Sequence, residues 1–139
     1  MTSNTKPIGV AYEDQNIIGA NVVYVDSELG YTAAAQGTVT QLTDKSTAVT
    51  LNKPAGRITT ANVALAGSTN VSFTLNNSYI SANDVLIVTL SGGIATAATY
   101  NCWVNSLSAG SASITLRNIT ASTSLTEAVI INFALIHCA

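Results

Sequence analysis

From residue 37 onward the chain consists of short apolar runs separated by Gly, Asn, Ser and Thr. In residues 70–76 the two kinds of residue alternate, which places Val71, Phe73 and Leu75 on one face and polar side chains on the other. This period-two alternation is typical of a strand that buries one face, whereas a surface helix would repeat about every 3.6 residues. The pattern therefore predicts an all-β domain over residues 37–139.

By the same criterion, about eight strands are expected in this domain. They cover residues 38–42, 47–51, 57–60, 70–76, 85–90, 100–107, 111–118 and 127–137. The first two are expected to form a hairpin, because Asp44 and Ser46 can hydrogen-bond their own backbone in the turn between them. An even set of short strands at regular spacing predicts an antiparallel β-sandwich of jelly-roll type.

Two of the expected strands are apolar on both faces. Residues 85–90 should form either a central strand or a strand whose outer face is covered by a partner chain. The last strand points four apolar side chains to one side and two to the other, namely Val129, Ile131, Phe133 and Leu135 against Ile130 and Ile136. A solitary copy would have to cover both faces, so we expect the protein to bind further copies of itself.

The expected interface between copies combines the last strand with the one tryptophan, and its residues are Ile130, Asn132, Ile136 and Trp103. Trp103 has a second interpretation, because it alternates with Asn101 and Asn105 and could belong to a surface that binds sugars or another protein. A core or subunit-interface tryptophan is favoured over that reading. A trimer is preferred to a dimer, although the sequence does not decide between them.

The first 36 residues have a different composition from the rest of the chain. They hold four of the seven acidic residues and only one basic residue, Lys6, and their apolar residues stand in small isolated groups. Such a segment cannot bury enough apolar surface to fold alone. We expect residues 1–36 to form an extended arm that docks on another surface through Ile8, Val10, Tyr12, Ile17, Ile18, Val22 and Tyr24. The alternative is that residues 22–25 form an edge strand of the β domain.

Composition narrows the classes of partner. A chain of 139 residues has room for one domain, and almost a quarter of its residues are Ser or Thr. The formal net charge of -2 gives no basic surface for nucleic acid or for an anionic membrane. No apolar run approaches the roughly twenty residues of a membrane helix, and residues 1–7 lack the apolar stretch of a signal peptide. We therefore expect synthesis in a cytoplasm and no binding to nucleic acid or membrane.

Catalytic chemistry has few candidate residues here. The one histidine, His137, lies two residues from the end of the sequence, which is a poor position for a catalytic triad. Carboxylates for a hydrolytic pair could come only from Asp44, Asp84 and Glu127, and each of these sits in a turn or at a strand boundary. The acids, the histidine and the cysteines form no ligand cluster for a metal. We expect no enzyme activity, no metal and no cofactor.

The two cysteines, Cys102 and Cys138, are too few and too far apart to indicate a disulfide framework. Buried free thiols are expected, since a cytoplasm keeps thiols reduced. A bridge between them is the alternative, and it would require their two strands to be neighbours.

Two segments carry a family resemblance. Residues 37–53 with 56–59, and residues 116–121 leading into 125–136, resemble a domain of tailed-bacteriophage structural proteins in order and spacing. The likeness covers about residues 37–137, and no motif within it is catalytic. It implies a virion component, either a cement (decoration) protein of the capsid or a domain of a head or tail fibre.

The small size and the N-terminal arm favour the cement protein, because fibre proteins are usually longer. The resemblance implies a protein on the capsid exterior that binds at junctions between major capsid proteins and stabilises the head, after synthesis in the host bacterial cytoplasm. The arm would lie over or between capsid subunits, and the sandwich would bind further copies. The alternative is a receptor- or carbohydrate-binding domain of a fibre, with Trp103, Tyr100 and Tyr79 in a surface groove.

Overall fold

The computed structural model describes residues 19–138, and the chain divides into two units, Met1–Gly30 and Tyr31–Ala139. Five of the predicted arm residues, namely Ile8, Val10, Tyr12, Ile17 and Ile18, lie outside the described residues. The described part of the first unit, residues 19–30, forms neither helix nor strand. The alternative in which residues 22–25 form an edge strand is therefore wrong.

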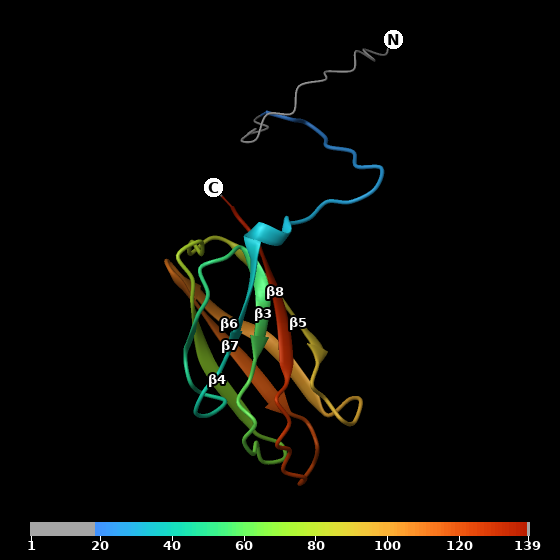
Figure 1. The fold of residues 1–139 in the computed structure, drawn as a ribbon, viewed down its shortest axis with the longest axis vertical. Helices are drawn as coiled ribbons and strands as arrows, with labels where there is room; N and C mark the ends of the chain where they lie inside the picture. Colours follow the sequence, from blue (N-terminus) through green and yellow to red (C-terminus); the bar gives the residue numbers. More distant parts are fainter. Residues whose placement is uncertain (1–18, 139) are drawn as a thin grey trace. The chain divides into compact units, whose positions relative to one another are not determined.

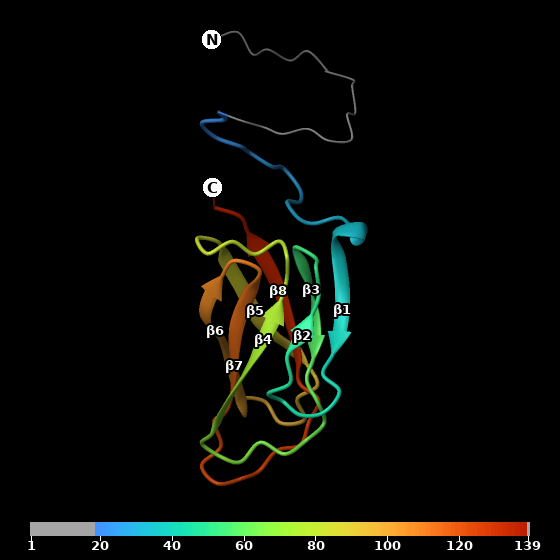
Figure 2. The same cartoon turned by 90° about the vertical axis from the view of Figure 1, so that its left-hand side faces the viewer.

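The second unit is all-β, as the alternation predicted, and its strands form two sheets that pack together as in a β-sandwich (Figures 1 and 2). One sheet, sheet A, has the strand order β1-β3-β8-β5, and the other, sheet B, has the order β2-β4-β7-β6. A short 3-10 helix, η1 (Ala33–Ala35), precedes them. The strands are β1 (Gln36–Thr40), β2 (Val49–Thr50), β3 (Ala55–Thr59), β4 (Asn70–Asn76), β5 (Val85–Gly92), β6 (Tyr100–Ser108), β7 (Ser111–Asn118) and β8 (Ile130–Ile136).

The core lies between the two sheets and is made of alternate side chains from both. In β4, Phe73 and Leu75 are buried and Val71 is half-buried, as the period of two predicted. The predicted inward face of the last strand is also buried, and its residues are Val129, Ile131, Phe133 and Leu135. Local alternation therefore identified the buried faces correctly.

The predicted hairpin between residues 38–42 and 47–51 is wrong. β1 belongs to sheet A and pairs in parallel with β3, whereas β2 belongs to sheet B and pairs in parallel with β4. The connecting loop is anchored by two buried polar side chains. The amide of Gln41 donates to the carbonyls of Lys45 and Thr47, and the ammonium of Lys45 donates to the carbonyls of Ala61 and Glu127, each at 2.6 Å. These bonds hold the loop in a crossover between sheets.

Two further expectations need correction. The strands are not all antiparallel, because each sheet contains one parallel pair. Residues 85–90 do not form a central strand either, since β5 lies at the edge of sheet A and pairs with β8 alone. Val85 and Ile87, on its outer side, are 49% and 46% exposed. Of the two interpretations of this strand, only a face covered by a partner chain is left as a prediction.

Candidate functional site

The outer face of sheet A carries a cluster of exposed aliphatic side chains. Val85 lies opposite Ile136, and Ile87 lies opposite Ala134, in the antiparallel register of β5 and β8. Directly opposed residues place their side chains about 5 Å apart on one face. Ile136 is 52% exposed, similar to Val85 and Ile87. We call these four residues the apolar patch, and a cluster of this kind on a sheet face is a candidate protein-binding surface.

A polar row crosses the same face beside the apolar patch. Thr38, Arg57, Asn132 and Thr89 occupy successive register positions on β1, β3, β8 and β5. The Nε of Arg57 donates a long hydrogen bond of 3.4 Å to the Oδ1 of Asn132. Arg57 is exposed and is the one charged residue among the outward-facing positions of the four described strands. The face is therefore apolar at one end and positively charged in its middle.

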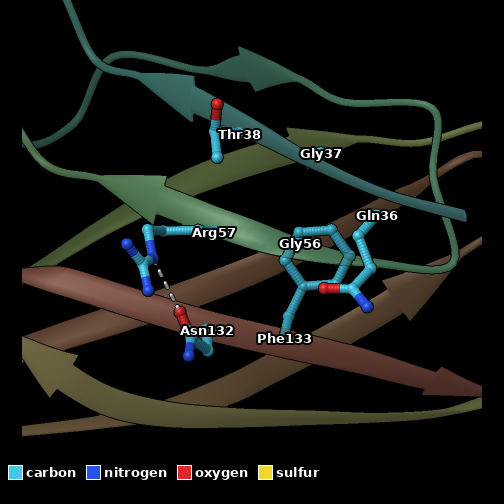
Figure 3. Close-up of a pocket in the computed structure, with 7 residues that line it drawn as sticks. All are labelled: Gln36, Gly37, Thr38, Gly56, Arg57, Asn132 and Phe133. Carbon is cyan, nitrogen blue, oxygen red and sulfur yellow. Dashed lines mark hydrogen bonds between the residues drawn. The ribbon is translucent and has the colours of Figure 1, made fainter. Parts of the chain in front are cut away.

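A hollow of about 410 Å³ lies beside Arg57 (Figure 3). It is lined by Gln36, Gly37, Thr38, Gly56, Arg57, Asn132 and Phe133. Gly37 and Gly56 are register partners, and the strands leave no room for a side chain here. A Cβ on Gly56 would lie 2.7 Å from the carbonyl oxygen of Gly37 and 2.7 Å from a methyl group of Leu51. The hollow is open, and its mixed polar and apolar lining with one guanidinium suits an acidic or amide side chain.

The outer face of sheet B is covered with hydroxyl groups. Ser72 lies opposite Thr115, which in turn lies opposite Trp103, and the two hydroxyl oxygens are 2.8 Å apart. Trp103 is half-buried on β6. Of the four predicted interface residues, β8 thus brings Ile130, Asn132 and Ile136 onto one face of sheet A, while Trp103 lies on the other sheet.

Of the three aromatic residues expected to line a carbohydrate-binding groove, one is not at the surface. Tyr100 is 5% exposed and packs in the core, where its hydroxyl donates to Oε2 of Glu127 at 2.7 Å. Tyr79 is 53% exposed in the turn between β4 and β5, and Trp103 lies on the face of sheet B. Tyr100 therefore cannot line a surface groove with the other two.

Lys45, Tyr100 and Glu127 form a polar cluster that sequence reasoning missed. Lys45 and Tyr100 are buried, and Glu127 is half-buried. Lys45 is only 3% exposed, and its ammonium also contacts the hydroxyl of Thr60. Burial lowers the pKa of Lys45, opposed by the nearby charge of Glu127. The bond from Tyr100 lowers the pKa of Glu127, while burial raises the pKa of Tyr100. The donors of this cluster are engaged within the protein, and they connect Lys45 to the backbone of Ala61 and Glu127, and Tyr100 to the side chain of Glu127.

Asp84 connects the start of β5 to the end of the chain. Its carboxylate accepts hydrogen bonds from the backbone N–H groups of Ser81 and Cys138, and Nδ1 of His137 lies 2.9 Å from Oδ1. Burial alone would raise the pKa of Asp84, but these hydrogen bonds outweigh it and the pKa is lowered. Asp44 is held separately, by Ser46 and Thr47. The three candidate carboxylates are thus each occupied by different local partners.

Both cysteines are free thiols, as expected, but each is only partly buried. Cys102 lies on β6, and burial raises the pKa of its thiol. A raised pKa disfavours the reactive thiolate at neutral pH. Cys138 follows β8, on the other sheet, and contributes its backbone N–H to Asp84.

In the described part of the first unit, the apolar side chains are exposed. Val22 and Tyr24, two of the predicted arm residues, are 58% and 92% exposed. Their neighbours Val23, Val25 and Leu29 are exposed as well. Asp26 and Glu28 follow the valines, and residues 19–35 contain no Lys or Arg. The segment therefore combines aliphatic and acidic side chains.

Within residues 19–138, no group of three or more His, Cys, Asp and Glu side chains is placed to hold a metal ion. None of the described helices has the length and apolar character needed to cross a membrane. Comparisons of the chain with protein-family models, curated proteins and solved structures found no match.

Proposed function

We propose that this protein is a bacteriophage capsid cement protein, which binds at junctions between major capsid proteins and stabilises the head. The observation that carries the proposal is that aliphatic side chains are exposed on two separate surfaces. One is the segment around Val22–Val25, and the other is the apolar patch of sheet A. Exposed apolar clusters mark protein interaction sites, and two of them suit a protein that joins other proteins together.

In this proposal the N-terminal arm binds the major capsid protein through the residues predicted from sequence, Val22 and Tyr24 among them. The sandwich binds further copies of itself, with a trimer preferred to a dimer. Ordering of the arm opposes binding, so repeated contacts across an oligomer would supply much of the affinity. The proposed location is the capsid exterior, and the proposal includes no catalytic activity, cofactor, nucleic acid or membrane.

A jelly-roll relationship is part of the same proposal. Successive strands from β1 to β6 alternate between the two sheets, which supports it. The parallel pairing of β1 with β3 and of β2 with β4 departs from an antiparallel jelly roll.

A fibre domain that binds carbohydrate is the second candidate function. It is favoured by Trp103, which is half-buried on the outer face of sheet B, opposite the buried Thr115 and two strands away from the exposed Ser72. Since Tyr100 is buried, the site would consist of this face and not of an aromatic groove.

Mass spectrometry first identifies a tailed phage whose particles contain this chain. Heads of that phage are then prepared without the chain, and the purified full chain is tested for co-sedimentation with them. The cement proposal expects saturable binding at a fixed ratio to the major capsid protein, and weakening by the double substitution Val22→Ser with Tyr24→Ser. Leu42→Ser is the matched control, since Leu42 is 91% exposed in a loop of the sandwich. Absence of the chain from phage particles, or equal binding by both variants, would contradict the proposal. Glycan-array binding abolished by Trp103→Ala would favour the fibre domain.

A further inference from the structure

We infer that the outer face of sheet A is the docking site for residues 23–28 of a second copy of this chain, with Val23 and Val25 on the apolar patch and Glu28 at Arg57. This inference deepens the self-association in the proposed function and rests on it.

The apolar contact would form between two exposed sets of aliphatic side chains, one on the apolar patch and one in residues 23–25. Val85 and Ile87 are two residues apart on β5 and point to the same side. Val23 and Val25 have the same spacing, and an extended segment points both to one side. Val22 and Tyr24 then point to the opposite side. The segment can therefore cover the apolar patch while Val22 and Tyr24 stay accessible to a capsid.

The charges of the two partners are complementary. Arg57 is the charged residue of the outward face of sheet A, and among the described residues its side chain donates a hydrogen bond to Asn132, at 3.4 Å. The segment supplies Asp26 and Glu28 and has no basic residue. An Arg guanidinium can bind a carboxylate through two parallel hydrogen bonds, and the hollow beside Arg57 leaves room for an incoming side chain.

The dimensions of segment and face agree. Arg57 on β3 lies two strands away from Ile87 on β5, at about 4.8 Å per strand, and two residues further along the strand direction, which adds a step of about 6.7 Å. The two positions are therefore about 12 Å apart on the face. Alternation along an extended chain would turn Glu28 to the same side as Val22 and Tyr24, but the chain bends at Asp26 and Ser27, and this bend lets Glu28 face Arg57. From Val25 to Glu28 the chain spans at most about 10 Å, and the long side chains of Glu28 and Arg57 span the remaining distance. The order Val23, Val25, Glu28 follows the order Val85, Ile87, Arg57 along the face.

A second copy fits this arrangement better than the segment's own sandwich. The hydroxyl of Tyr31 donates to the carbonyl of Leu135, beside Ile136, so the chain enters its own sandwich near the apolar end of the face. For docking on the same copy, the chain would have to place Glu28 at Arg57 and then turn back, so that Val23 reaches Val85. A neighbouring copy imposes no such reversal. Because each copy has both the segment and the face, exchange covers both surfaces in every copy.

The experiment measures the self-association constant of the full chain by sedimentation equilibrium, with no capsid present. Arg57→Glu and Glu28→Lys are each expected to weaken self-association by about fivefold, the scale of reversing one exposed ion pair. An equimolar mixture of the two variants should recover association between unlike copies, because both of their pairings are then of opposite charge. A dimer should recover fully, whereas a trimer, which must also pair two like copies, should recover in part. Arg117→Glu, the same charge change on sheet B, is the control and should have no effect.

Ile87→Ser should weaken association about tenfold, whereas Leu42→Ser should leave it unchanged. Circular dichroism verifies that each variant is folded. A wild-type chain that is monomeric at every concentration would overturn the inference, and so would association unaffected by Arg57→Glu and Ile87→Ser. If the variants weaken association and the mixture recovers none of it, the pairing of Glu28 with Arg57 between copies is overturned. Self-association is measured without capsid and head binding is measured with it, so a chain that associates but does not bind heads contradicts the proposed function alone, and a chain that stays monomeric overturns this inference.

Discussion

The outer faces of the two sheets differ in how their side chains are satisfied. On sheet B, hydroxyls bond one another, as Ser72 and Thr115 do, and water can bond the rest. On sheet A, the aliphatic side chains of Val85, Ile87 and Ile136 are about half exposed and can form no hydrogen bonds with water. The comparison teaches that a β-sandwich can carry one face suited to water and one suited to a protein partner. Sheet A is therefore the side for which we propose self-association.

The largest expected effect is a difference in stability between substitutions on the two sides of β8. Ile131 is fully buried, so Ile131→Ala should destabilise the protein by about 2–5 kcal/mol. Ile136 is 52% exposed, so Ile136→Ala should change stability by no more than about 1 kcal/mol. Urea unfolding of both variants measures the difference. Equal losses would show that the outer face of sheet A is needed for folding, and the comparison of the two faces would fail.

A second prediction concerns the loop that carries the chain from sheet A to sheet B. Lys45→Met keeps the length of the side chain but leaves the buried carbonyls of Ala61 and Glu127 without their donor. A loss of roughly 2–4 kcal/mol is expected in chemical denaturation. Lys53→Met is the control, since Lys53 donates to one exposed carbonyl, that of Ala34. A stable Lys45→Met variant would mean that this anchor does not hold the crossover.

A third prediction tests the close contact of β1 and β3 beside the hollow of sheet A. Gly56→Ala should cost roughly 1–3 kcal/mol, because the new methyl group would lie 2.7 Å from a backbone oxygen. Gly92→Ala, on the other edge of the same sheet, meets its nearest atom at 3.5 Å and should be tolerated. Thermal unfolding of the two variants checks the contrast. Equal melting temperatures would contradict the packing described here.

The proposed difference in self-association between the two faces can be tested with one substitution on each face. Val85→Glu places a charge in the apolar patch, and Thr74→Glu places the same charge among the hydroxyls of sheet B. Neither should change stability by more than about 0.5 kcal/mol, since both sites are accessible to water. Only Val85→Glu should weaken self-association, measured by sedimentation equilibrium. Equal weakening by both would remove the distinction between the faces.

The smallest expected effect is a dependence of stability on acid. The pKa values of Asp84 and Glu127 are lowered in the folded protein, so their stabilisation is present above the ordinary pKa of about 4 and is lost as pH falls through the folded values. Asp84→Asn and Glu127→Gln should each flatten the curve of unfolding free energy against pH below about pH 4. Asp26→Asn, a matched change outside the sandwich, is the control. A curve unchanged by the two variants would show that these bonds do not contribute.

Strand positions were predictable where the signal was local. Residues 70–76 and 111–118 coincide with β4 and β7, and the buried side of β8 was identified residue by residue. Alternation reports which side chains of one strand face the core, so it needs no knowledge of the neighbouring strands. It could not tell that β1 and β2 belong to different sheets, because the turn residues Asp44 and Ser46 fit a hairpin and a crossover equally well.

The candidate surfaces depended on strand pairing. Three of the four predicted interface residues lie together on β8, since they share one strand, whereas Trp103 is on the opposite sheet. The apolar patch requires β5 to be the edge neighbour of β8, and Lys45 had no sequence signal of burial because its acceptors come from residues 61 and 127.

By itself the sequence determined the class of fold, the strand faces and the scarcity of reactive groups, because these follow from residue type and from a period of two. Only the tertiary structure decided which strands lie at edges, which apolar face is left to water and where Arg57 meets that face. Such features arise from hydrogen bonds between residues far apart in the chain, and the free energy of those pairings is not a property of any local pattern.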